Sequence, residues 1–84
     1  MLQPIDEPID AYVVYQRGAP HPILRAFRWK NRRFDVTATN LVHPEREGQT
    51  HFLCYAVSCG KNEFRLRLNT TRCVWILDAI DGEA

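Results

Sequence analysis

The sequence predicts an all-β domain: an antiparallel meander of five to six strands, curled into a small, partly open barrel of the SH3-like type. Apolar and polar residues alternate in both arms of the segment 23–42 and again in 63–69, and this alternation is typical of half-buried strands. No segment has the periodicity of an amphipathic helix. Short turns between consecutive strands indicate antiparallel pairing, and so small a sheet must curl to enclose a core. A curved single sheet is the alternative.

The chain begins with a lead, residues 1–10, in which Pro4 and Pro8 suit an edge or a tether better than a central strand. The first strand is predicted at 11–16, where β-branched and aromatic residues are dense. Residues 17–22 contain one glycine and two prolines, which predicts a loop.

The next two strands form a predicted hairpin, with arms at 23–29 and 33–42 around the polar hinge Lys30-Asn31-Arg32. Asn31 tolerates the positive φ that a tight turn requires. Residues 43–49 are polar and include Pro and Gly, so they are predicted to form the longest exposed loop.

The second half of the chain contains three more candidate strands. Residues 50–59 are rich in apolar and β-branched residues, and the turn 60–62 leads into 63–69, the clearest amphipathic strand. Residues 73–77 are apolar throughout, as expected of a strand covered on both sides. Residues 78–84 form a predicted acidic tail. The core is expected to contain the large apolar members of these strands: Phe27, Phe34, Val36, Phe64, Leu66, Trp75 and Leu77.

Length and charge limit what such a chain can be. Its 84 residues make a single small domain, 1–84, and a hydrophobic content of 45% argues against global disorder. The net charge is +1, but residues 11–77 contain eleven basic residues and only four acidic ones, a balance of +7. There is no apolar run of membrane-spanning length and no basic, apolar start typical of a secretory signal. A cytoplasmic location is therefore expected.

Aromatic and turn residues recur at characteristic spacings. Residues 27–36 read F-x-W-x-x-R-x-F-x-V, and an aromatic strand precedes the turn 60–62. The turn leads into F-x-L at 64–66, and residues 75–77 read W-x-L, followed by Asp81. Over most of the chain after residue 5, this pattern resembles a bacterial family of small β-rich domains of unknown function. The resemblance implies work linked to DNA, since some members are encoded near, or fused to, translesion-polymerase-like proteins. The chain departs from the family at Asn31, where Gly is expected, and at Val42-His43, where Trp is common.

Metal binding and catalysis have no motif in the sequence. The candidate ligands are Cys54, Cys59, Cys73, His21, His43 and His51. None forms the closely spaced pair of a structural zinc site, and the odd separation of Cys54 and Cys59 sends them to opposite faces of a strand. The three cysteines are therefore expected to be reduced, buried thiols that pack as small hydrophobes. We expect no metal, no cofactor and no enzymatic activity, because no nucleophile motif or phosphate loop is present either.

The basic residues are the one functional lead. The candidate binding residues are Arg25, Trp29, Lys30, Arg32, Arg33, Arg65 and Arg67. If they converge beside an exposed aromatic ring, they form a surface that attracts phosphates and stacks bases, as in single-strand binders. The alternative is an ordinary solvated face, with Trp29 in the core, because the isoelectric point of about 7.8 is low for a dedicated nucleic-acid domain.

Two functions follow from these observations. The first is a non-enzymatic binding module whose basic hairpin contacts nucleic acid or an acidic protein partner. The second is a protein-interaction or self-associating domain that pairs a sheet edge, with the basic residues serving only solubility. Added salt separates the two, because displaced counterions make phosphate binding strongly salt-dependent.

Overall fold

The computed structural model describes residues 2–82, and every regular element in this range is a strand. The strands are β1 (Leu2–Val14), β2 (Ile23–Trp29), β3 (Arg32–Asp35), β4 (Ala38–Glu47), β5 (Thr50–Cys59), β6 (Asn62–Asn69) and β7 (Val74–Asp81). The predicted all-β class is confirmed. The number of strands is seven rather than five to six, and none of the described residues forms a helix that could cross a membrane.

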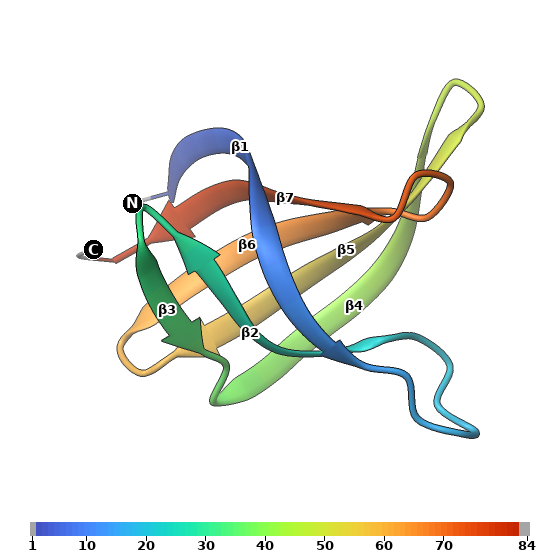
Figure 1. The fold of residues 1–84 in the computed structure, drawn as a ribbon. Coiled ribbons are helices and arrows are strands. Elements are labelled where there is room, and N and C mark those ends of the chain that lie inside the picture. The colour runs from blue at the N-terminus through green and yellow to red at the C-terminus, as the bar shows by residue number, and fades with distance from the viewer. Residues whose placement is uncertain (1, 83–84) are drawn as a thin grey trace.

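All seven strands belong to one antiparallel sheet with the order β3-β2-β1-β7-β6-β5-β4. The sheet does not close, so β3 and β4 are its edges. β1 serves two layers, because residues 2–9 pair with β7 whereas residues 10–14 pair with β2. Consequently β2, β3 and the end of β1 form a front layer that crosses over the back layer of β4 to β7 (Figure 1).

The core lies between these layers. Phe27 of β2, Phe34 of β3 and Phe64 of β6 form an aromatic cluster with ring centroids 5.0–5.3 Å apart. Six of the seven predicted core residues are buried, whereas Val36 is half-buried against the cluster. Trp29 and Trp75 are buried too.

Near both ends of the chain, the strands include more residues than the sequence predicts. The lead 1–10 is described from Leu2, and it is part of β1 rather than a tether. Over residues 2–9 only β7 lies alongside it, an edge-like setting that tolerates prolines. The expected acidic tail 78–84 contributes residues 78–81 to β7, and residues 83–84 lie outside the described residues. From Trp75 to Ala79, β7 alternates between buried and half-buried positions instead of being covered on both sides.

The middle of the chain differs from the prediction in two places. The expected strand 33–42 is divided at Val36-Thr37, because the chain passes there from the front layer to the back layer. The Val36 amide bonds to Arg25 of β2, whereas the Thr37 amide bonds to Ser58 of β5. The expected loop 43–49 is instead the second half of β4, which runs to Glu47 before a tight turn.

Candidate functional site

The seven predicted binding residues lie on two separate surfaces. Five of them belong to the β2–β3 hairpin: Arg25, Trp29, Lys30, Arg32 and Arg33. The other two, Arg65 and Arg67, lie on β6 in the back layer. Phe64 faces the hairpin across the core, so Arg65 projects from the opposite face of its strand. Five of the residues therefore share one hairpin of the front layer, whereas the β6 arginines lie on the far side of the molecule.

The hairpin ends in a two-residue turn. Trp29 pairs with Arg32, which leaves Lys30 and Asn31 as the two central residues. Both have positive φ, 53° and 60°, as a type I′ turn requires. The expectation that Asn31 adopts positive φ is confirmed, and Lys30 does so as well. The turn presents the Lys30 side chain at the end of the front layer.

Two cations of the hairpin lie over aromatic rings of the core. Lys30 Nζ is 4.8 Å from the centroid of the Trp29 ring, and the Arg32 guanidinium is 5.1 Å from that of Phe34. These contacts hold the side chains against the core while their charged groups reach water. Within residues 2–82, neither Lys30 nor Arg32 has a carboxylate within 4.0 Å.

Within the described residues, Arg33, unlike Lys30 and Arg32, has a carboxylate partner. Its guanidinium lies 4.8 Å from the Tyr12 ring centroid, and its Nε donates to Asp35 Oδ1 at 2.8 Å. Arg33 and Asp35 both belong to β3, and this ion pair is exposed to solvent. The hydrogen bond and the charge of Asp35 raise the pKa of Arg33. Arg25 is exposed beside a register shift between β1 and β2.

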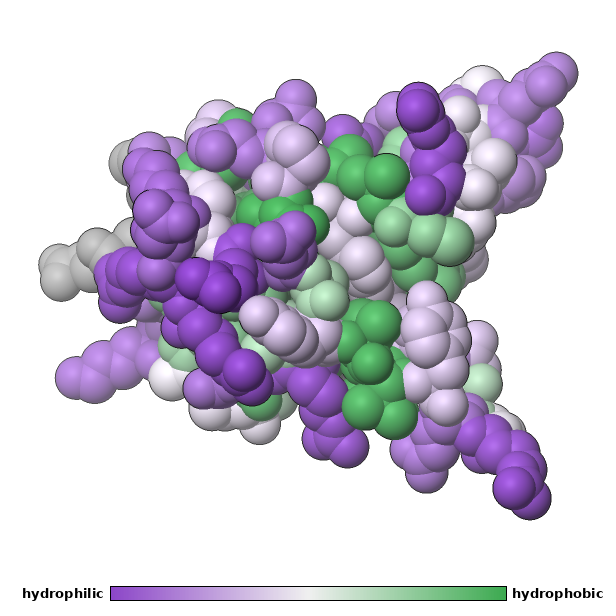
Figure 2. Space-filling view, in the orientation of Figure 1, coloured by the Kyte–Doolittle hydropathy of each residue, from purple (hydrophilic) through white to green (hydrophobic). Residues whose placement is uncertain are grey.

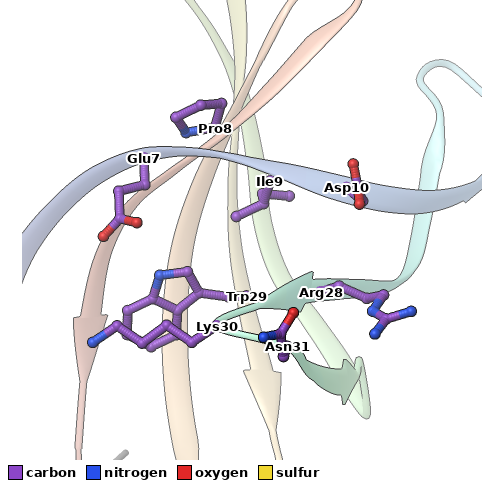
Figure 3. A pocket seen from close by; sticks show the side chains of 8 residues that line it. All are labelled: Glu7, Pro8, Ile9, Asp10, Arg28, Trp29, Lys30 and Asn31. Atoms are coloured by element: carbon purple, nitrogen blue, oxygen red, sulfur yellow. The ribbon is translucent and has the colours of Figure 1, made fainter.

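A groove lies next to the hairpin turn, where β1 leaves β2 (Figure 3). Its volume is about 470 Å³, with residues 7–10 of β1 on one side and residues 28–31 on the other. The groove exists because pairing between the two strands stops at Asp10 and Arg28, after which β1 turns away toward β7.

Trp29 has an unsatisfied donor in this groove. The residue is only 8% exposed, yet its buried Nε1 has no hydrogen-bond partner within the described chain. Figure 3 shows the Nε1 edge of the indole turned toward the β1 side of the groove. An unpaired buried N–H costs about 1–3 kcal/mol, so an acceptor that enters the groove gains a prepared donor.

Charges of both signs border the groove. Arg28 and Lys30 lie on the hairpin side, whereas Glu7 and Asp10 lie on the β1 side. Hydrophilic side chains cover the part of this face where the hairpin lies, and hydrophobic ones gather toward the end of β1 (Figure 2). Around the groove, the cations thus lie on the hairpin side and the carboxylates on the β1 side.

Arg67 is held by acidic neighbours. Its guanidinium lies 2.8 Å from Asp78, 3.3 Å from Glu47 and 3.5 Å from Asp6, and it also covers the Phe52 ring at 4.8 Å. The Arg67 side chain is 21% exposed. Burial raises the pKa of Asp78, and the charge of Arg67 opposes that rise. With three carboxylates around it, Arg67 is neutralised within the chain.

A second group of chemically active side chains lies on β4 and β5. Ligand atoms of His43, Glu45 and Cys54 all lie within 4.8 Å of one another. Cys54 Sγ donates to Glu45 Oε2 at 2.9 Å, and His43 Nε2 is 4.0 Å from Glu45 Oε1. Burial, followed by the hydrogen bond and charge of Glu45, raises the pKa of the Cys54 thiol to about 12.

Sequence reasoning missed this cluster because it compared positions within one strand. The informative signal was the turn after Glu47, since residues equally distant from a hairpin turn face each other. A turn placed at Gly48-Gln49 would have predicted His43 opposite Cys54, as observed. The thiols also differ from expectation: Cys54 and Cys59 are half-buried and Cys73 is exposed.

No protein-family model matches this chain, and no curated protein or solved structure matches it either. The resemblance to a bacterial family of small β-rich domains stays a prediction.

Proposed function

We propose that this chain is a non-enzymatic binding module whose β2–β3 hairpin and adjoining groove contact the phosphate backbone of a nucleic acid. The observation that carries the proposal is the unpartnered, buried Nε1 of Trp29. This residue lines a groove that has Arg28 and Lys30 on its hairpin side and Glu7 and Asp10 on its β1 side. A negatively charged group that reaches this donor lies in the field of both cations, whose side chains extend toward opposite ends of the groove (Figure 3). Hydrogen bonds to ionised groups are roughly twice as strong as neutral ones.

Several neighbouring side chains extend this contact beyond the groove. Lys30 and Arg32 lie over core rings and have their charged groups in water. Among residues 2–82, neither has a carboxylate partner. Tyr12, 41% exposed, lies on the same layer beneath Arg33 and offers a ring for base stacking. Phosphates repeated along a strand suit such a row of cations, which favours nucleic acid over a single acidic side chain of a protein.

Edge pairing is the alternative function, and two features of the edges count against it. β4 is the longer edge, but it contains Pro44 and a register shift between Thr39 and Leu41. Prolines and bulges on an edge discourage the addition of a further strand. β3 has only four residues, which leaves a partner strand few backbone groups to bond.

We extend the proposal to the type of barrel, the family and the cellular location. A sheet that folds over on itself, with β1 shared by both layers, supports a partly open barrel of the SH3-like type. Membership of the bacterial family and a cytoplasmic location are proposed on the sequence pattern alone.

Fluorescence anisotropy with labelled single-stranded DNA at low ionic strength tests the proposal. We expect weak binding with little sequence preference, and a marked loss of affinity as salt is added. The charge reversal Arg32→Glu should weaken binding severalfold and flatten the salt dependence. Arg65→Glu is the matched control, because Arg65 is an exposed cation on the far layer.

Each outcome decides between the candidates. Equal losses from the hairpin variant and from Arg65→Glu would reduce the effect to overall charge and overturn the proposed surface. Binding of a polyglutamate peptide in preference to DNA would assign the hairpin to an acidic protein partner. Concentration-dependent self-association, indifferent to salt and to both variants, would instead support edge pairing.

The substitution Trp29→Phe tests whether a ligand group bonds to Nε1 of Trp29. This substitution keeps an aromatic ring in the core but removes the Nε1 donor, so folding should be retained while DNA affinity falls. The matched control is Trp75→Phe, since Trp75 is equally buried but lies outside the groove. Unchanged affinity in Trp29→Phe would show that no ligand group enters the groove.

A further inference from the structure

We infer that His43, Glu45 and Cys54 form a binding site for one zinc ion on the outer face of the β4–β5 hairpin. The three side chains supply a nitrogen, an oxygen and a sulfur ligand atom, all within 4.8 Å of one another. This site lies on the back layer and shares no residue with the groove beside Trp29.

Strand pairing positions the three ligands before any metal arrives. His43 and Cys54 lie directly opposite each other in the antiparallel register of β4 and β5. Glu45 is two residues beyond His43, so its side chain leaves the same face of β4. Both strands are fixed by a ladder that is uninterrupted from Leu41 to the turn after Glu47. Binding therefore requires rotation of side chains but no rearrangement of the backbone.

The observed separations suit a tetrahedral ion after small adjustments. Zinc binds sulfur at about 2.3 Å and nitrogen or oxygen at about 2.0–2.2 Å, which places ligand atoms roughly 3.3–3.8 Å apart by tetrahedral geometry. Cys54 Sγ and Glu45 Oε2 are 2.9 Å apart, and His43 Nε2 and Glu45 Oε1 are 4.0 Å apart. These distances bracket the range that zinc requires.

The choice of metal follows from the donor set. A thiolate favours zinc over magnesium and calcium, which prefer sites made of oxygen atoms alone. Imidazole and carboxylate complete a mixed set that zinc accepts in proteins. Three protein ligands leave one tetrahedral position for water or for a group from a partner.

The surroundings favour a dication. The ligands border a hollow of about 260 Å³ that is also lined by Asp78 and Arg65. Arg67 of β6, which lies opposite Cys54 in the strand register, is already neutralised by Asp6, Glu47 and Asp78. The acidic groups therefore outnumber the basic ones around the site, and their field attracts a positive ion.

Such an ion would tie the edge of the sheet to its neighbour. β4 has a partner on only one side, and its side chains are exposed at nine of ten positions. Two ligands on β4 and one on β5 would clamp this weakly packed strand. Because the paired ligands exist only in the folded chain, bound zinc should raise the melting temperature.

Cobalt substitution tests the site directly, with the full 84-residue chain reduced, freed of metal and then titrated with Co²⁺. We expect one equivalent of cobalt to give a thiolate-to-metal charge-transfer band, and one equivalent of zinc to displace it. Cys54→Ser should abolish the band, whereas His43→Asn or Glu45→Gln should weaken zinc affinity by about tenfold or more. Melting curves of the metal-free variants check that each still folds.

Two matched controls keep the assignment specific. Cys73→Ser removes an exposed thiol elsewhere, and His51→Asn removes an exposed imidazole of β5, and both should bind metal as the unmodified chain does. A band that survives Cys54→Ser but is lost in Cys73→Ser would overturn the proposal. So would the absence of a band in a folded chain, or zinc binding without any rise in melting temperature.

Discussion

The guanidinium of Arg67 lies 2.8 Å from the carboxylate of Asp78, although its Nε–H is not aligned for a hydrogen bond with that oxygen. Asp78 lies where the register between β7 and β6 shifts. Asp6 lies where the register between β1 and β7 shifts. Bulges re-aim side chains locally, so two strands each direct a carboxylate toward one arginine of a third.

Loss of this arginine should destabilise the back layer. Arg67→Ala leaves the surrounding carboxylates unneutralised and uncovers the Phe52 ring, so we expect a cost of about 1–3 kcal/mol in the free energy of unfolding. The measurement is urea denaturation at low and high salt, and the cost should shrink with salt. Arg65→Ala, an exposed change on the same strand, should cost less than about 0.5 kcal/mol. Equal costs for the two variants would contradict the assigned role of Arg67.

The aromatic cluster between the layers should dominate stability. Phe64→Ala removes a ring whose centroid lies 5.0 Å from those of both Phe27 and Phe34. Such a deletion leaves a cavity and should cost about 3–5 kcal/mol in denaturant melts. Leu41→Ala serves as the control, because Leu41 is 55% exposed and its truncation should change stability by less than about 0.5 kcal/mol. A small effect at Phe64 would mean that the layers do not meet there.

Alkaline pH should destabilise the fold through Tyr55. Burial, and secondarily the charge of Tyr15, raises the pKa of Tyr55 to about 12, and its hydroxyl donates to the Pro22 carbonyl at 2.5 Å. The unfolded chain ionises near a pKa of about 10. The folded state thus keeps a proton that the unfolded state releases, so this stabilisation is complete below pH 10 and is lost as pH rises toward 12.

Melting curves of Tyr55→Phe across this pH range test the assignment. The variant should be less stable at neutral pH by about 0.5–1.5 kcal/mol, because it lacks the hydrogen bond. Its stability should then fall less steeply above pH 10 than that of the unmodified chain. Burial also raises the pKa of Cys59, to about 11, but Cys59 is present in both proteins and its contribution cancels. Parallel pH profiles would rule out Tyr55 as the source.

The hairpin turn offers a stabilising substitution. Lys30 has φ of 53° in the first central position, and a left-handed conformation costs an ordinary residue about 1–2 kcal/mol. Asn-Gly is the preferred pair for this turn type. The double substitution Lys30→Asn with Asn31→Gly should therefore raise stability by about 0.5–1 kcal/mol in urea melts. Asn31→Val, a β-branched residue at φ of 60°, should lower it. The opposite order of stabilities would exclude a type I′ turn.

Local patterns were sufficient for several parts of the fold. The hairpin around Asn31 and the strand with Phe64 and Leu66 follow from alternation and turn chemistry, and both are observed. These features depend on residues close together in the chain. The same local rules failed for residues 43–47, where Pro44 suggested a loop although it lies in an edge strand.

The candidate site was predictable only in part. The cations of the hairpin were identified because they are adjacent in the sequence. Their separation from Arg65 and the neutralisation of Arg67 were not, because these depend on which layer faces which and on carboxylates as distant as Asp6. The groove beside Trp29 likewise depends on β1 leaving β2 at Asp10.

By itself, the sequence determined the all-β class, most of the core residues and the turn at Lys30-Asn31, because alternation and turn propensity act over a few residues. Only the tertiary structure decided that β1 joins β7 to β2, and that His43 faces Cys54. The physical reason is that the residues of a strand determine which of its faces is apolar. The register of that strand and the identity of its neighbours depend on the packing of all strands around one core. The functional proposals rest on these pairings, which bring distant residues within contact.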